Sequence, residues 1–344
     1  MRRLNAAGLL AVLFLSLACA SHQQGSVPAD PQSSEFRHDI STGAKPWTHS
    51  NFDNNEDTFT FALFSDLTGG EREGIFAVAV EQLNLLRPEL ILNVGDLIEG
   101  GTRDRAQLER EWNSFDQRAR GTRAPVFYTG GNHDLTNPEM WAVWDERYGR
   151  RYYHFVYKDT LFLVMDTEDN TPEVQWELSR IRDESMVVVK EKGWGAFPAT
   201  AYGKSTLRQT GQVSAEQAAY FTRVIDANTE VKHTFVLLHK PAWRRADEEN
   251  FAAVEDALNG RPYTVFAGHE HDYQHELRRE RDYILLGTTG GVQNASKAMA
   301  IDHVTLVTVA DDGVAIANLR MSGIFDKTGV IPAKGDTLCF EDCK

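Results

Sequence analysis

LILNVGD, residues 90–96, is the stretch that decides the fold: an apolar run that ends in a glycine and an aspartate. Similar runs occur at TFTFALFSD (58–66) and PVFYTGGNHD (125–134). Between them, residues 71–86 and 105–120 carry apolar side chains at helical spacing. This strand–helix–strand–helix–strand order predicts a parallel sheet with right-handed crossovers. Because ligands of open α/β sheets bind beyond the carboxyl ends of the strands, the polar residues that end these runs are candidate site residues.

Two later apolar runs end in the same way. TFVLLH (234–239) ends in a histidine, and YTVFAGHEH (263–271) ends in a Gly-His-Glu-His sequence. Carboxylate, amide and imidazole groups at such strand ends are ligands that suit Mn, Fe or Zn. The sequence therefore predicts a hydrolytic site that holds metal ions. Its candidate residues are Asp66, Asp96, Asn132, His133, His239, His269 and His271.

The chemistry of each residue type suggests a part in such a site. Asp96, in a tight Gly-Asp turn, is a candidate to bridge two metals, since a metal pair needs a shared ligand such as a carboxylate. Asn132 offers a neutral amide oxygen, and His133 is placed to donate a proton or to stabilise charge on a substrate oxygen. The neighbouring Asp134 is a candidate to orient that imidazole.

The rest of the chain predicts a second sheet and more helices. Residues 152–157 and 161–165 form a predicted hairpin. The long segment 169–211 breaks the regular alternation, and it is predicted to be either a cap near the mouth of the site or a surface excursion. The sum is a two-sheet sandwich flanked by helices. The other predicted helices cover 138–148, 214–228 and 248–258, and the other predicted strands cover 283–286, 303–309 and 314–319.

Composition limits the class of protein. The chain has 344 residues, of which 42% are hydrophobic and 25% are charged, and this suits one large α/β domain, predicted over 58–320. A net charge of −14 argues against non-specific binding of nucleic acid, which needs clustered Lys and Arg. It does not exclude a small phosphate ester as substrate, because bound cations reverse the local potential.

The N-terminus predicts export. Residues 1–20 combine a basic start with an apolar run that is too short to span a membrane comfortably. Two processing routes are open: ordinary cleavage before Ser21, or lipidation of Cys19 at a lipobox-like sequence. The second is favoured and predicts a periplasmic or cell-envelope lipoprotein, held at the membrane by its lipid.

The ends of the chain carry two further predictions. Residues 21–57, rich in Ser, Gln, Pro and Asn, are predicted to form a flexible tether. The tail 321–344 contains Cys339 and Cys343, which are close enough in sequence to form a small disulfide in an exported protein. That pairing would leave Cys19 as the single cysteine.

Taken together, these motifs resemble the calcineurin-like metallophosphoesterase superfamily, whose pattern runs D-x-H, G-D, G-N-H-[DE], H, G-H-x-H. The resemblance covers roughly 59–319 and implies a four-layer α/β/β/α sandwich that hydrolyses a phosphate ester with a metal-activated water. One or two divalent or trivalent ions are implied. By this likeness the first metal takes Asp66, Asp96 and His271, the second takes Asp96, Asn132, His239 and His269, and His133 is the catalytic imidazole.

The chain departs from the pattern at the first motif, where Thr68 occupies the usual histidine position. Three outcomes are open: a weak or absent first metal, a water held by Thr68, or Glu99 as a substitute ligand. A rival hypothesis follows from the same residue. It is a catalytically weakened member that keeps the fold as a binding or scaffolding module.

Overall fold

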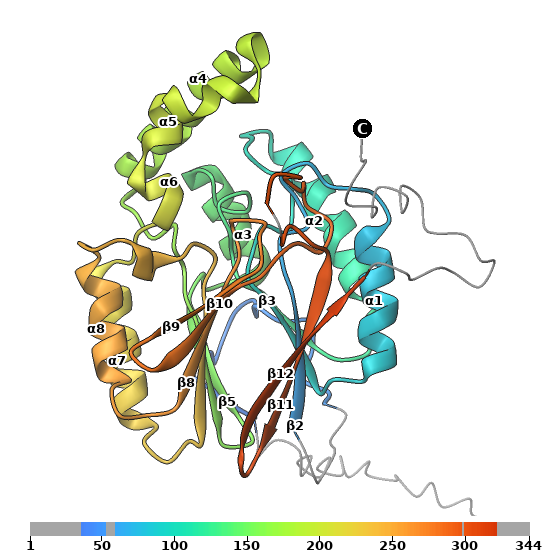
Figure 1. Cartoon of the computed structure of the whole chain (residues 1–344), viewed down its shortest axis with the longest axis vertical. Helices are drawn as coiled ribbons and strands as arrows, with labels where there is room; N and C mark the ends of the chain where they lie inside the picture. Colours follow the sequence, from blue (N-terminus) through green and yellow to red (C-terminus); the bar gives the residue numbers. More distant parts are fainter. Residues whose placement is uncertain (1–35, 53–58, 298, 322–344) are drawn as a thin grey trace, which may run out of the picture.

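The computed structural model describes residues 36–52, 59–297 and 299–321, and these form two β-sheets with helices on their outer faces (Figure 1). One sheet is five-stranded in the order β12-β11-β2-β3-β4, and the other is seven-stranded in the order β1-β5-β6-β7-β8-β10-β9. The predicted mixed α/β sandwich is confirmed. Within the described ranges, no helix is both long enough and apolar enough to cross a membrane.

The five-stranded sheet contains the motif-bearing strands from the first half of the chain. β2, β3 and β4 run parallel, as predicted, and Phe64 pairs with Asn93 in the register. Because β2 and β3 end side by side, Asp66 and Asp96 leave the sheet at one edge. The strands are β2 (Phe59–Phe64), β3 (Leu90–Asn93), β4 (Val126–Phe127), β11 (His303–Ala310) and β12 (Gly313–Arg320).

The seven-stranded sheet contains the later motifs. The predicted hairpin is confirmed as the antiparallel pair β5–β6. β6, β7 and β8 are parallel, and Leu237 pairs with Phe266, so His239 and His269 also leave their sheet at one edge. β9 was not predicted from the sequence. The strands are β1 (Phe36–His38), β5 (Tyr153–Tyr157), β6 (Thr160–Val164), β7 (His233–Leu237), β8 (Tyr263–Ala267), β9 (Gln274–Arg278) and β10 (Arg281–Leu285).

Apolar side chains fill the three interfaces between four layers. Trp112 and Trp144 pack under the helices of the five-stranded sheet, while Phe221 packs under those of the other sheet. Phenylalanines fill the space between the sheets; the rings of Phe155 and Phe162 lie 4.6 Å apart. Each fully buried ring stabilises the fold by about 2–3 kcal/mol. The helices are α1 (Ile75–Leu86), α2 (Arg105–Ala119), α3 (Pro138–Tyr148), α7 (Ala215–Ala227) and α8 (Glu249–Ala257).

The predicted tether is wrong for residues 36–52, which belong to the folded body. β1 pairs with β5, and Trp47 forms an isolated antiparallel β-bridge with Phe127 of β4. Ile40, Trp47 and Phe52 are buried in the core between the sheets. A few widely spaced apolar side chains therefore anchor a segment whose average composition is polar. The predicted signal peptide with Cys19, the rest of the tether and the possible Cys339–Cys343 disulfide lie outside the described residues.

The segment 169–211 forms a helical arm, here called the cap arm, at the top of Figure 1. Its main helix takes up about half of the arm and includes the valines at 187–189. Gln175 donates to the carbonyl of Leu135 at 2.9 Å, and Lys240 donates to the carbonyl of Leu207 at 3.0 Å, so both ends of the arm are tied to the body. Its elements are α4 (Pro172–Lys192), a 3₁₀-helix (Trp194–Ala199), α5 (Ala201–Lys204) and α6 (Thr206–Thr210).

Candidate metal centre

Side chains from the ends of strands in both sheets meet at one buried point. One donor atom each of Asp66, Asp96 and His239 lies within 4.8 Å of the other two. Asp66 follows β2, Asp96 follows β3 and His239 follows β7, so the two sheets both contribute to the cluster. These three residues are buried. Two carboxylates and an imidazole this close together are a suitable ligand set for a divalent cation.

The Nε2 atom of His239 lies close to two side-chain oxygen atoms. It is 3.3 Å from Asp96 Oδ2 and 3.1 Å from Asn132 Oδ1. The Nδ1 atom of His239 lies 2.8 Å from the carbonyl of Val94, a contact that assigns the proton to Nδ1 and leaves the Nε2 lone pair toward the oxygens. Ligands that share an ion at bond lengths of about 2.1 Å are about 3 Å apart. These three donor atoms therefore fit a metal ion.

The electrostatics at this point favour a positive charge. Burial lowers the pKa of His239, but the attraction of Asp96 outweighs it and raises the pKa to about 9. For Asp96, burial opposes ionisation, yet the neighbouring histidines His239 and His133 hold the pKa of the carboxyl well below its usual range. A metal ion would supply the positive charge that the extra proton on His239 supplies beside Asp96.

His269 supplies an independent test of fit. Its ring lies 5.2 Å from that of His239, and its backbone N–H donates to Asp66 Oδ1 at 3.0 Å. Its Nε2 is buried and has no hydrogen-bond partner among the described residues. Burial holds the pKa of His269 well below the usual value, so the ring is neutral, the form that binds metals. A buried polar atom without a partner costs about 1–3 kcal/mol, which a metal ion would offset.

His271 forms the other side of the centre with Asp66. Its Nε2 lies 3.3 Å from Asp66 Oδ1, and its Nδ1 lies 2.5 Å from the carbonyl of Val292. The second oxygen of Asp66 accepts the hydroxyl of Ser65. Every sequence-predicted ligand therefore lies in one connected cluster: His271 beside Asp66, Asp66 beside Asp96, and His239, His269 and Asn132 beyond them.

The glycines of the motifs make this convergence possible. A Cβ on Gly131 would lie 2.3 Å from Asp96 Oδ1, and a Cβ on Gly268 would lie 2.3 Å from Asp66 Oδ2. Only glycine lets the backbone approach the carboxylates so closely. Several candidate ligands have left-handed backbone, a strain that clusters at functional sites. They are Asp66 (φ 24°), Asp96 (φ 57°), His269 (φ 73°) and His271 (φ 51°).

His133 lies next to the metal-ligand candidates without being one of them. Its Nδ1 is 2.8 Å from the carbonyl of Glu99, and its backbone N–H donates to Asp96 Oδ1 at 2.8 Å. A Cβ on Gly69 would lie 3.5 Å from His133 Nε2 and 3.3 Å from His271 Cε1. Nε2 of His133 therefore lies on the same side as the His271 ring.

Asp134 does not orient His133, in contrast to the sequence-based hypothesis. Its carboxylate accepts the backbone N–H groups of Leu97 and Ile98 through Oδ1 and that of Gly131 through Oδ2. Burial, and then the negative charge of Asp96, raise the pKa of Asp134 to about 8. Its role is to join the loops that follow β3 and β4, while the Glu99 carbonyl orients the imidazole.

Thr68 and Glu99, the residues that bear on the incomplete first motif, both make structural contacts. The buried Thr68 hydroxyl donates to the carbonyl of Asp96 at 3.2 Å. Glu99 Oε1 accepts the N–H groups of Gly70 and Glu71 at 2.8 and 2.7 Å. These contacts favour Glu99 as a support for the loop at Gly70 and Glu71 over Glu99 as a metal ligand.

The cap arm contributes side chains beside the candidate metal ligands. Tyr202 and Arg182 line a small cavity together with Asn132. Arg208 lies over the ring of Phe197 at 5.2 Å, and its charge contributes to lowering the pKa of His269, after burial and the charges of His239 and Lys240. In the described part of the chain, Arg208 forms no ion pair. The tie between Lys240 and the residue before Arg208 explains this proximity, and the linear sequence carries no sign of it.

Comparison with known proteins agrees with this geometry. The family model described as calcineurin-like phosphoesterase matches residues 59–273. A dimetal phosphatase from Danio rerio is similar in structure (TM-score 0.52, 15% identity, covering 77% of this chain and 96% of that one). Purple acid phosphatase PPD1 from yellow lupin seeds is similar too (TM-score 0.50, 11% identity, covering 79% and 53%). No curated protein matches the sequence at a significant level.

Identities this low establish a shared fold only, whereas the family model spans more than half of the sequence and all of the motifs described above. The chain belongs to the calcineurin-like phosphoesterase family.

Proposed function

We propose that this protein hydrolyses a small phosphate ester at the Asp96–His239 centre, with metal ions as cofactors. The observation that carries the proposal is the convergence of Asp66, Asp96 and His239 within 4.8 Å beside a buried His269 Nε2 that has no partner in the described residues. Asp66, Asp96 and His271 would hold one ion, and Asp96, Asn132, His239 and His269 a second. Mn, Fe and Zn all suit these ligands.

When bound, the metals would lower the pKa of a water molecule, supply the nucleophile and neutralise charge on the phosphoryl oxygens. The protein groups have separate tasks. The Val94 and Val292 carbonyls orient the rings of His239 and His271. The Glu99 carbonyl orients His133 with Nε2 toward the substrate position, where a protonated ring would donate to a phosphoryl or leaving-group oxygen.

The cap arm would add a cation to this site. We assign Arg208 to the binding of the substrate phosphate, because it is half-buried, lacks an ion-pair partner within the described residues and acts electrostatically on His269. Lys240, in contrast, is paired with Glu168 inside the protein. This assignment makes the segment 169–211 a cap that contributes to substrate binding.

A second candidate function is a catalytically weakened member of the family that binds ligands without efficient turnover. Thr68 is the observation in its favour, since its hydroxyl contacts a backbone carbonyl rather than completing the side of the centre formed by Asp66 and His271. The two functions differ in a measurable way. A binding module would take up metal and inorganic phosphate but would not turn over.

The cellular location remains a proposal from the N-terminal sequence: a periplasmic or cell-envelope lipoprotein anchored through Cys19. Mass spectrometry of the membrane fraction tests it directly. A mature chain that begins at a lipid-modified Cys19 supports the proposal, and one that begins at Ser21 rules it out.

One experiment tests the proposed function. The purified protein is analysed for metals and is then assayed with 4-nitrophenyl phosphate and bis(4-nitrophenyl) phosphate, alongside Asp96→Asn. We expect bound metal and hydrolysis of at least one ester in the wild type, with both reduced by at least tenfold in the variant. Bound metal without turnover on either ester favours the binding module, and absence of metal contradicts both functions.

A further inference from the structure

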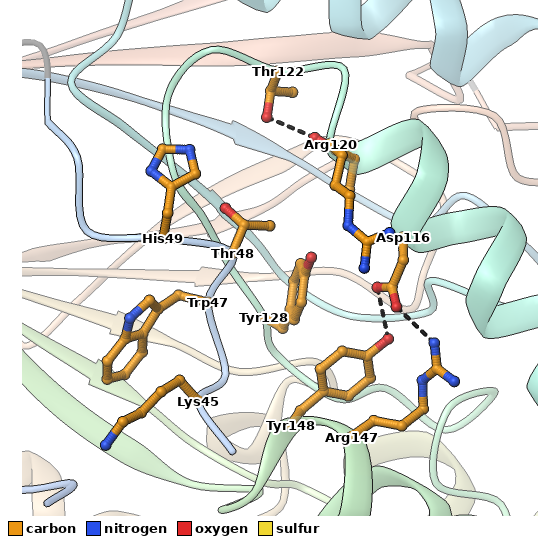
Figure 2. Close-up of a pocket in the computed structure, with 11 residues that line it drawn as sticks. Lys45, Trp47, Thr48, His49, Asp116, Arg120, Thr122, Tyr128, Arg147 and Tyr148 are labelled. Carbon is orange, nitrogen blue, oxygen red and sulfur yellow. Dashed lines mark hydrogen bonds and ion pairs between the residues drawn. The ribbon is translucent and has the colours of Figure 1, made fainter. Parts of the chain in front are cut away.

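A cavity of about 330 Å³ lies at the outer side of β4, and its lining residues include none of the candidate metal ligands (Figure 2). The segment from Lys45 to His49 forms one wall, because the carbonyl of Pro46 accepts the N–H of Tyr128 at 2.8 Å. The ends of α2 and α3 form the other wall, with Arg120 and Arg147. A volume of this size is enough for a small organic molecule.

Tyr128 offers the cavity a hydrogen-bonding group that the protein does not use. Only 3% of the residue is exposed, and its hydroxyl has no hydrogen-bond partner in the ranges that the structure describes. Figure 2 shows this hydroxyl directed into the space between Thr48 and Arg120. Burial raises the pKa of Tyr128, so the group stays protonated and acts as a donor. A hydroxyl that opens onto a cavity and has no protein partner is available to a ligand.

The other uncommitted groups around the cavity are donors as well. His49 Nδ1 accepts the N–H of Asn51 at 3.2 Å, which assigns the ring proton to Nε2. The Thr48 hydroxyl accepts the N–H of Val126, so its own proton is available. Arg147 Nε is buried without a partner among the described residues, and Arg120 forms no ion pair there. The cavity therefore offers N–H and O–H groups in excess.

The one carboxylate at the cavity is already engaged. The oxygens of Asp116 accept the Tyr148 hydroxyl at 2.8 Å and Arg147 Nη2 at 2.7 Å. The Thr122 hydroxyl donates to the carbonyl of Ala119 at 2.7 Å, as the dashed line in Figure 2 shows. A ligand that only accepts hydrogen bonds would satisfy the free donors, whereas the one carboxylate that would attract a cation is already paired with Arg147 and hydrogen-bonded by Tyr148.

We propose that this cavity is a second binding site, separate from the metal centre, for a small oxyanion: a phosphate or carboxylate group held by Tyr128, Arg120, His49 and Thr48. Trp47 lines the same cavity and gives the organic part of such a ligand an apolar surface. Arg120, Arg147 and Lys45 outnumber the one carboxylate in the lining, so the cavity is locally positive although the net charge of the protein is −14. The proposal does not depend on the proposed function.

The test uses the full chain with its metals and measures binding of inorganic phosphate by equilibrium dialysis and of benzoate by calorimetry. Phosphate probes the phosphate source and benzoate the carboxylate source. The variants are Tyr128→Phe, which removes only the free hydroxyl, and Arg120→Gln. Arg123→Gln, a nearby exposed arginine that does not line the cavity, is the matched control.

We expect at least one probe to bind with a dissociation constant that rises at least tenfold in Tyr128→Phe and in Arg120→Gln. Arg123→Gln should bind as the wild type does, and hydrolysis of phosphate esters should be unchanged in all three variants. If Tyr128→Phe and Arg120→Gln bind both probes as tightly as the wild type, or if all binding disappears on removal of the metals, the proposal is wrong.

Discussion

Asp96 Oδ1 lies 2.3 Å from the position that a Cβ atom on Gly131 would occupy. The same Cβ would lie 2.5 Å from the Asp96 nitrogen and 2.9 Å from His239 Nδ1, so there is no flexible group that can move away cheaply. The loops that follow β3 and β4 can therefore approach this closely only because Gly131 has no side chain. The metal centre depends on this contact as much as on its ligands.

Gly131→Ala is expected to displace Asp96 and to weaken metal binding at least tenfold, which corresponds to about 1.4 kcal/mol. Overpacking of this kind costs a further 1–3 kcal/mol or so of folding stability. Metal analysis and thermal unfolding measure the two effects. Gly195→Ala is the matched control, since nothing lies within 4 Å of a Cβ there. Equal metal content in both variants would contradict the steric role of Gly131.

His133→Ala should lower turnover by a factor of about 10²–10³ while the metals stay bound, because general acid–base groups contribute on that scale. The reason is geometric: the ring is oriented by the Glu99 carbonyl and is not part of the ligand cluster. Metal analysis of the same sample separates catalysis from structure. Loss of the metals together with activity would instead make His133 a support of the centre.

Much of the fold and of the site was predictable because the end of a buried strand shows in the sequence as an apolar run followed directly by polar site residues. An apolar run predicts a buried strand, and the polar residues after it mark the edge where ligands bind, so Asp66, Asp96 and His239 could be placed without a structure. The glycines beside them are part of the sequence motifs and were also identified from the sequence. The distances they permit became clear only in three dimensions.

The rest was not predictable because it depends on contacts between distant segments. Residues 36–52 are polar on average, and only the pairing of Trp47 with Phe127 shows why they fold onto the sheet. The orientation of His133 comes from a backbone carbonyl, which any residue at position 99 would offer. The influence of Arg208 on His269 depends on the link between Lys240 and Leu207, residues that are 33 positions apart.

Glu99→Ala is expected to leave the metal content unchanged, since Glu99 Oε1 binds two backbone N–H groups. Loss of these charge-assisted hydrogen bonds should reduce the free energy of unfolding by about 1.5–3 kcal/mol. Glu99→Gln keeps an acceptor and should recover part of the stability. Metal analysis and urea unfolding test this, and loss of one metal atom per chain in both variants would identify Glu99 as a ligand after all.

His303 should make the fold sensitive to acid. Its Nε2 accepts the N–H of Gly287 at 2.9 Å inside the core, and burial lowers its pKa to about 4. The unfolded chain, with an ordinary histidine pKa near 6.5, binds more protons between these values, so the free energy of unfolding falls as the pH drops. From pH 7 to pH 5 this contribution amounts to about 2 kcal/mol.

Urea unfolding of the wild type and of His303→Gln at pH 7 and pH 5 checks this expectation. The variant keeps an acceptor without a titrating group, so its loss of stability on acidification should be smaller than that of the wild type. His275→Gln, at an exposed position on β9, is the control. Identical pH dependence in the wild type and His303→Gln would show that another group is responsible.

Arg208→Ala tests the contribution of the cap arm to substrate binding. Arg208 is a half-buried cation on α6 near His269, and the substrate is an anion, so its removal should weaken ground-state and transition-state binding alike. We expect KM for 4-nitrophenyl phosphate to rise by about tenfold, as for the loss of one charge-assisted hydrogen bond, with kcat changed by less than about threefold. Arg223→Ala, an exposed arginine on α7, controls for the change in net charge.

If both variants raise KM equally, the effect is one of overall charge. If Arg208→Ala changes neither constant, Arg208 does not bind the phosphate, and Arg182 and Tyr202, the cap-arm residues that line the cavity beside Asn132, become the next ones to test.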